Sequence, residues 1–175
     1  MINSPDTPIQ PDVDASQALA EAQCQRGLGK PELALPWLEK ACNLDPDSVE
    51  IICESLGALQ DCQQWQLSLQ LLQSPAAQRL KSDPSFQLMR LRALIHCGKA
   101  QQGAEELLQL QHQLTFDPVD LGIVLLEAKV LQGQLEQAQM CLEQLRQFDP
   151  SDAVMASARW KLLRHSWSME DCDGW

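Results

Sequence analysis

The sequence predicts an all-α protein in which a helical hairpin is repeated about four times. Three observations support this fold class: the composition, a set of evenly spaced glycines and small residues, and four Asp-Pro pairs. Aromatic residues make up only 5% of the 175 residues and Tyr is absent, whereas strands favour β-branched and aromatic side chains. Leu, Ala, Gln and Glu are common, and all of them favour helices.

Gly29, Gly98 and Gly133 mark one column of the repeat, and Gln63 fills the position missing between the first two. Three further columns keep the same spacing of about 35 residues, which is typical of helical repeat arrays. The columns are the small residues Ala34, Ser68, Gly103 and Ala138, the leucines Leu38, Leu72, Leu107 and Leu142, and the earlier apolar residues Ala22, Leu56, Leu91 and Leu126.

Each unit is interpreted as two helices joined at the glycine column. Glycine tolerates the left-handed conformation that ends a helix, the small residue allows two helices to approach closely, and the leucine packs inward from the same helix face. Aspartate is a preferred N-cap, and proline suits the first position of a helix. We therefore expect a new helix to start at each of Asp45-Pro46, Asp83-Pro84, Asp117-Pro118 and Asp149-Pro150.

In chain order, the pattern predicts a disordered arm, four repeats, a capping helix and a polar, acidic tail with two tryptophans. The second repeat lacks its turn glycine, and Pro75 predicts a disturbed turn over residues 74–82. The predicted ranges are 1–14 for the arm, 15–48, 49–83, 84–118 and 119–152 for the repeats, 153–166 for the capping helix and 167–175 for the tail.

The repeat resembles the tetratricopeptide repeat (TPR), a 34-residue helix–turn–helix unit. The first unit carries the resemblance best, and the early aromatic residue and the later Tyr of the family pattern are absent from every unit. The resemblance implies a right-handed superhelix, or α-solenoid, whose first helices line a concave groove. The matching positions of the first unit are Ala22, Gly29, Ala34, Leu38, Ala41 and Pro46.

The resemblance also implies which residues point into the groove. Arg92 is the strongest single candidate for contact, although packing between helices is the commoner role for any one of these positions. Leu19 and Gln23 stand where a carboxylate-binding groove of this family would carry Lys and Asn, which disfavours binding of chaperone tails. The partner-binding candidates are Leu19, Gln23, Arg26, Leu88, Arg92, Ile95, Ile123, Glu127 and Val130, and the same register adds Ser16, Glu50, Cys53, Gly57, Gln60, Ser85 and Asp120.

The net charge of −11 disfavours general nucleic-acid binding, because an acidic chain repels phosphates. The charge is uneven: residues 63–99 carry +4, between an acidic start and an acidic stretch over residues 100–150. This basic band is either an unevenly solvated surface or a docking place for an acidic segment of a partner.

No apolar run approaches the ~20 residues of a membrane-spanning helix, and the first 14 residues resemble neither a signal nor a transit peptide. The odd count of seven cysteines argues against a disulfide framework and favours a reducing compartment. We therefore expect a cytoplasmic protein, and the initial Met and the capping helix favour a complete one. The excess of Gln over Lys suggests a bacterial source.

The sequence contains no motif that predicts catalysis or metal binding. There is no glycine-rich phosphate loop, HExxH, GxSxG or CxxC pair, and the three histidines are far apart. His96 and Cys97 are neighbours, but adjacent residues of a helix point about 100° apart and share a proton poorly. We therefore expect no catalytic residues, metal or cofactor.

The sequence thus predicts a non-enzymatic protein-interaction module, an adaptor, scaffold or assembly factor that binds a peptide or helix of another protein. The partner segment is expected to be acidic if the basic band is its docking place. A regulatory or targeting domain associated with an enzyme such as a transferase is the alternative. A self-assembling array is disfavoured by the net charge, which predicts a monomer.

Overall fold

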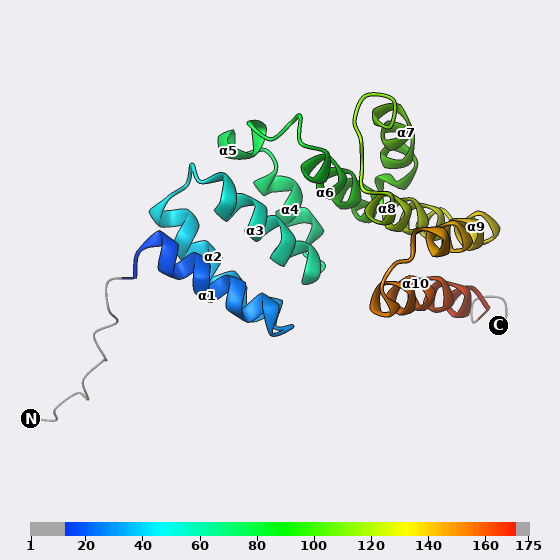
Figure 1. The fold of residues 1–175 in the computed structure, drawn as a ribbon, viewed down its shortest axis with the longest axis horizontal. Coiled ribbons are helices and arrows are strands. Elements are labelled where there is room, and N and C mark those ends of the chain that lie inside the picture. The colour runs from blue at the N-terminus through cyan, green and yellow to red at the C-terminus, as the bar shows by residue number, and fades with distance from the viewer. Residues whose placement is uncertain (1–12, 171–175) are drawn as a thin grey trace, which may run out of the picture.

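The computed structural model describes residues 13–170, with the side chains of residues 13–164. All regular structure in this part of the chain is helical, so the predicted all-α class is confirmed (Figure 1). The helices are α1 (Ala15–Gly27), α2 (Pro31–Leu44), α3 (Val49–Asp61), α4 (Trp65–Leu71), α5 (Pro75–Gln78), α6 (Pro84–Leu94), η1 (Ile95–Lys99), α7 (Ala100–Leu110), α8 (Pro118–Leu131), α9 (Leu135–Leu145), η2 (Arg146–Phe148) and α10 (Asp152–Glu170).

The predicted turn column is found at four equivalent bends. Gly29, Gly98 and Gly133 have φ angles of 72°, 85° and 71°, and Gln63 takes the same left-handed conformation with φ 57°. These bends separate α1 from α2, α3 from α4, α6 from α7 and α8 from α9. Glycine adopts this conformation without strain, whereas Gln63 bears the cost of a side chain in it.

The Asp-Pro pairs start helices at only two of the four predicted places. Asp83 accepts a hydrogen bond from the Phe86 N–H, and Asp117 accepts bonds from the first turn of α8, as expected of N-caps. Asp45 instead ends α2, and Asp149 has a positive φ angle after η2. The prediction fails there because a serine follows within a few residues and is an equally good N-cap. Ser48 caps α3, and Ser151 accepts a bond from the N–H of Val154.

The second repeat is disturbed where Pro75 predicted it. Its second helix, α4, ends at Leu71, and the short helix α5 follows with Pro75 at its first position and Ser74 as its N-cap. Ala76 and Ala77 of α5 are fully buried. The inserted turn therefore adds to the core instead of looping away from it.

Every position of the three packing columns is buried: the small residues of the second helices, the leucines that follow them, and the apolar residues of the first helices. The core forms four clusters, and each joins one hairpin to the next helix or hairpin. The small column has the role predicted for it, because a Cβ added at Gly103 would lie 2.6 Å from the Ile95 side chain. Each hairpin thus buries its apolar face partly against its successor.

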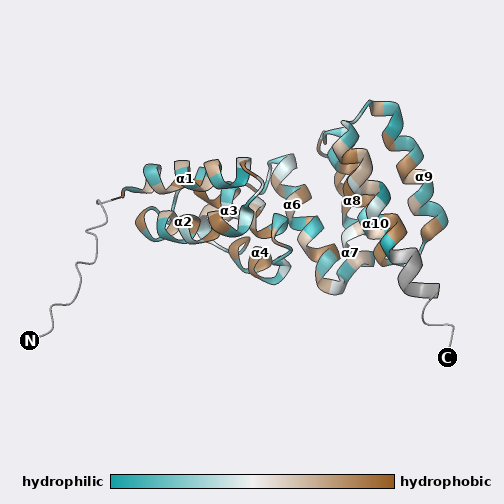
Figure 2. Cartoon of the chain, turned by 90° about the horizontal axis from the view of Figure 1, so that it is seen from below, coloured by the Kyte–Doolittle hydropathy of each residue, from teal (hydrophilic) through white to brown (hydrophobic). Residues whose placement is uncertain are grey.

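The hairpins follow one another along the molecule from α1 to α10 (Figure 1). Consecutive first helices are in contact, α1 with α3, α3 with α6 and α6 with α8, and α10 packs against α8 and α9. Figure 2 shows that no labelled helix is uniformly hydrophobic, and no helix of the described residues is long and apolar enough to cross a membrane.

The helix α10 occupies the place of the predicted capping helix and extends beyond both predicted ends, 153 and 166. Met155 and Ala158 are buried against α8 and α9, while Leu163 is 48% exposed. Residues 1–12 of the predicted arm and 171–175 of the predicted tail lie outside the described residues.

Candidate functional site

The first helices of the four hairpins line a narrow cleft of about 260 Å³, here called the inner cleft. Most of its walls come from positions predicted to face the groove. Its floor is mixed, with apolar side chains from α6 and α8 between polar and charged ones. The lining residues are Arg26, Gly57, Gln60, Asp61, Ser85, Leu88, Met89, Arg92, Asp120, Ile123 and Val124.

Arg26 lines the inner cleft and pairs α1 with α3. Its guanidinium donates to Glu54 at 2.6 Å and to Asp61 at 2.8 and 3.1 Å. Gly57 makes room for this arrangement, because a Cβ there would lie 2.8 Å from the guanidinium nitrogens. Arg26 is therefore already compensated by two carboxylates.

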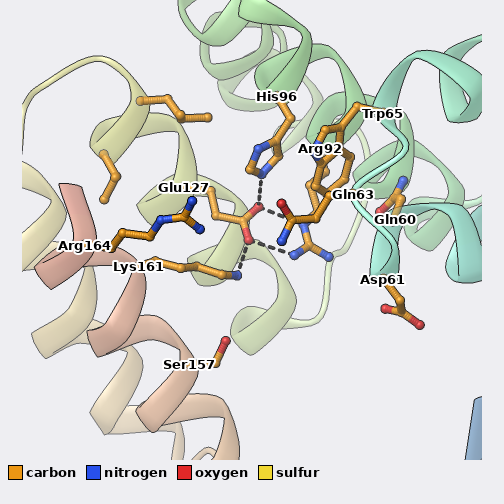
Figure 3. A pocket seen from close by; sticks show the side chains of 12 residues that line it. Gln60, Asp61, Gln63, Trp65, Arg92, His96, Glu127, Ser157, Lys161 and Arg164 are labelled. Carbon is orange, nitrogen blue, oxygen red and sulfur yellow. Dashed lines mark hydrogen bonds and ion pairs between the residues drawn. The ribbon is translucent and has the colours of Figure 1, made fainter. Parts of the chain in front are cut away.

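A larger cleft of about 610 Å³, here called the C-terminal cleft, adjoins the inner cleft and shares Gln60, Asp61 and Arg92 with it. Figure 3 shows that its side chains come from α3 and the turn after it, from α4, α6 and η1, and from α8 and α10. The lining residues are Gln60, Asp61, Gln63, Trp65, Arg92, His96, Glu127, Val130, Leu131, Ser157, Lys161 and Arg164.

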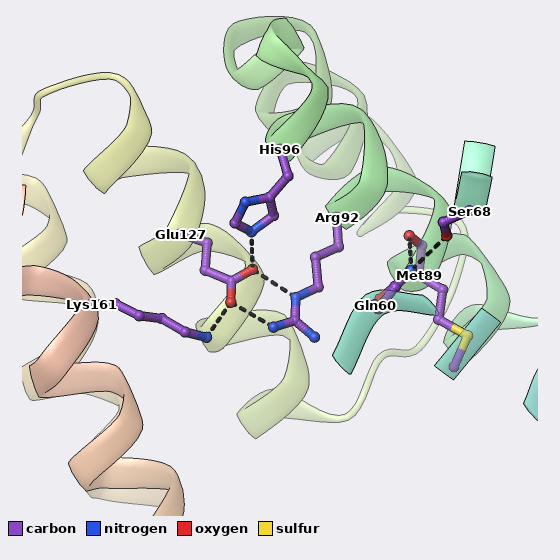
Figure 4. Close-up of polar contacts among 7 residues, drawn as sticks. All are labelled: Gln60, Ser68, Met89, Arg92, His96, Glu127 and Lys161. Carbon is purple, nitrogen blue, oxygen red and sulfur yellow. Dashed lines mark hydrogen bonds and ion pairs between the residues drawn. The ribbon is translucent and has the colours of Figure 1, made fainter. Parts of the chain in front are cut away.

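Glu127 is the centre of this cleft and is 2% exposed. Arg92 donates to both of its carboxylate oxygens, each at 2.7 Å, His96 Nε2 lies 3.1 Å from one oxygen, and Lys161 donates to the other (Figure 4). Burial alone raises the pKa of Glu127, but the hydrogen bonds from His96 and Arg92 and the charges of Arg92 and Lys161 outweigh it. They hold the pKa well below the ordinary glutamate value.

Trp65 sets the positions of the two residues that reach Glu127 from α6 and η1. Its ring stacks on the His96 imidazole with centroids 4.0 Å apart and planes at 7°. The Arg92 guanidinium lies 5.6 Å from the Trp65 centroid, within cation–π range. Next to this cluster, Gln60 donates to the backbone carbonyl of Met89 at 2.8 Å and so ties α3 to α6 (Figure 4).

The clefts bring together some of the predicted groove residues and exclude others. Arg26, Leu88, Arg92 and Ile123 line the inner cleft, and Arg92, Glu127 and Val130 line the C-terminal cleft. Leu19 and Ile95 are buried in core clusters instead, and the exposed Gln23 lines neither cleft.

Sequence reasoning missed Trp65, His96, Lys161 and Arg164. Trp65 and His96 lie beside the turns of their hairpins, and Lys161 and Arg164 lie in α10, where the repeat pattern assigns no groove position. The pairing of Arg92 with Glu127 does have a signal in the sequence. The two residues are 35 positions apart, which is the period of the repeat, and they have opposite charges.

Within residues 13–164 there is no group of three or more His, Cys, Asp or Glu side chains that could hold a metal ion. No family model, no curated protein and no solved structure matches this chain. The two clefts therefore have to be interpreted from their own chemistry.

Proposed function

We propose that this chain is a TPR-like α-solenoid that binds a peptide or helix of another protein along the inner cleft and performs no catalysis itself. The observation that carries the proposal is the lining of that cleft by α1, α3, α6 and α8 together. A continuous surface built by successive first helices suits an elongated ligand better than a compact one.

The chemistry of the inner cleft supports a peptide with mixed side chains. Leu88 and Ile123 offer apolar contact, and Ser85 and Asp120 offer hydrogen-bonding groups in the same cleft. Arg26 and Arg92 already pair with carboxylates of this chain. Binding along the inner cleft therefore does not depend on a charged anchor, and apolar contacts and backbone hydrogen bonds contribute most of the affinity.

Ser85→Arg tests the proposal, because Ser85 is exposed and lines the inner cleft, so that a long side chain there obstructs it. Ser82→Arg is the matched control: Ser82 is also exposed, lies in the preceding turn and lines neither cleft. Partners are captured from a lysate of the source organism on wild type and on each variant, and are quantified by mass spectrometry.

We expect the Ser85→Arg variant to recover the specific partners at least about fivefold less well than wild type, and the Ser82→Arg variant to recover them equally. Circular dichroism checks that both variants keep the helical fold. Equal recovery by all three proteins would refute binding along the inner cleft.

A further inference from the structure

We propose that the C-terminal cleft is an acceptor site for one carboxylate side chain, Asp or Glu, that lies next to an apolar residue in the bound peptide. The inference rests on the proposed function, since it names one feature of the partner segment. It concerns a cleft that the repeat pattern alone does not predict, because α10 forms one of its walls.

The cations around Glu127 carry a surplus of hydrogen-bond donors. The two oxygens of Glu127 already accept bonds from Arg92 Nε and Nη2 and from Lys161, and one also lies within bonding distance of His96 Nε2. Arg92 Nη1 has no partner among the described residues, and an ammonium group such as that of Lys161 carries three donor hydrogens. The Arg92 guanidinium and the Lys161 ammonium therefore each keep a donor for a second carboxylate.

Arg164 supplies a third cation to the same cleft. It lines the C-terminal cleft from α10, its side chain is exposed, and it forms no ion pair with the described residues. Arg92 and Lys161 already pair with Glu127, whereas no acid of the described residues occupies the planar guanidinium of Arg164. A guanidinium of this kind binds carboxylates through two parallel hydrogen bonds.

The charge of the lining decides between a carboxylate and a phosphate. Three cations, Arg92, Lys161 and Arg164, face two acids, Asp61 and Glu127, so the formal charge of the lining is +1. A single carboxylate brings that sum to zero. A phosphate group of charge near −2 leaves an excess negative charge beside a buried carboxylate, which is unfavourable.

The cleft also offers an apolar surface for the neighbouring residue of the peptide. Leu131 lines it and is 43% exposed, and Val130 lies beside it on α8. An apolar side chain of the peptide packed there removes its own surface and that of Leu131 from water. It also excludes water from the adjacent ion pairs, which strengthens them.

The test uses three short peptides, capped at both ends, with a central Glu-Leu, Gln-Leu or phosphoserine-Leu pair and otherwise the same neutral sequence. Binding to the full chain is measured by NMR titration, with the indole N–H of Trp65 as reporter. The key variant is Arg164→Glu, which changes the formal charge of the lining from +1 to −1. The matched control is Arg159→Glu, which makes the same charge change at an exposed position of α10 outside the cleft.

We expect the Glu peptide to bind at least about tenfold more tightly than the Gln peptide and more tightly than the phosphoserine peptide. Arg164→Glu should weaken the Glu peptide about tenfold or more, and Arg159→Glu less than about twofold. Equal binding of the Glu and Gln peptides, tighter binding of the phosphoserine peptide, or equal effects of the two variants would each overturn the proposal.

The same measurements separate this site from the proposed function. If the Glu peptide fails to bind while Ser85→Arg still abolishes partner capture, the carboxylate site is wrong and the inner-cleft proposal stands. If the Glu peptide binds as expected but Ser85→Arg captures every partner as well as wild type does, the inner-cleft proposal is wrong and the carboxylate site stands.

Discussion

Replacing Glu127 by Gln keeps the shape of the side chain and removes its charge, so it isolates the electrostatic role of the buried carboxylate. Three groups depend on that charge: Arg92 and His96 on one side and Lys161 of α10 on the other. In Glu127→Gln, the amide accepts bonds through only one oxygen and presents its NH₂ group to donors. Both cations then lose their counterion.

The structure sets the size of the effect. Removing one partner of a fully buried ion pair costs about 3–5 kcal/mol. Arg92, His96 and Lys161 are 29%, 21% and 32% exposed, so water takes over part of what the carboxylate provided. We therefore expect Glu127→Gln to lower the free energy of unfolding by about 2–3 kcal/mol, which corresponds to a fall in Tm of roughly 5–10 °C for a chain of this size.

The assay is urea unfolding followed by far-ultraviolet circular dichroism. Glu143→Gln is the matched control, because Glu143 pairs with Arg146 on the exposed face of α9 at 49% exposure. An exposed pair of this kind contributes less than about 0.5 kcal/mol. If both variants unfold within about 0.5 kcal/mol of wild type, the buried carboxylate does not hold the helices together and the reasoning is wrong.

Three further predictions follow from the caps, the turns and the buried carboxylate. The folded-state pKa of Glu127 lies below its ordinary value, so its contribution to stability is complete above the unfolded-state pKa of about 4.3 and is lost as the pH falls further. The difference in unfolding free energy between wild type and Glu127→Gln therefore narrows in urea titrations repeated from about pH 7 down to about pH 3. Asp117→Ala removes the α8 cap and costs about 1 kcal/mol in the same assay, whereas Asp45→Ala, at a position that caps no helix start, costs less than about 0.5 kcal/mol. Gln63→Gly relieves a left-handed side chain and raises the Tm by a few degrees, whereas Gly98→Ala at φ 85° lowers it, each measured by thermal unfolding.

The sequence predicts most of the fold because each unit of the repeat carries the same local sequence pattern. One glycine followed by a small residue is weak evidence, but the column that ends with Gly133 appears in every hairpin, and even Gln63 follows it. The N-caps are less predictable, because Asp45 and Ser48 satisfy the same chemical requirement and only the packing of α2 and α3 decides between them.

The clefts are harder to predict than the fold because they depend on which side chains pair or pack with one another. The groove register places Ile95 and Arg92 on the same face of the α6 segment, yet Ile95 is 1% exposed and Arg92 reaches the cleft. For residues outside the groove register, the repeat pattern does not predict whether they line a cleft. Trp65 and His96 meet because the start of α4 packs against η1 of the next hairpin, which no spacing within one unit predicts.

The net charge of a sequence window is a poor guide to the free charge of a repeat array. The basic band over residues 63–99 suggested a central docking place for an acidic segment, but three of its cations pair with acids outside it: Arg79 with Asp47, Arg90 with Glu106 and Arg92 with Glu127.

One of these pairs follows the repeat period. Arg92 and Glu127 are 35 residues apart and hold equivalent positions of neighbouring first helices, where opposite charges meet across the repeat boundary. Arg26 and Asp61 pair across another boundary, one residue out of register. The helix α10 packs against α8 and α9 and brings Lys161 to Glu127 as a second cation. Arg164 lines the C-terminal cleft from α10 and pairs with no acid of the described residues, so among these residues an uncompensated positive charge lies beside α10 and outside the basic band.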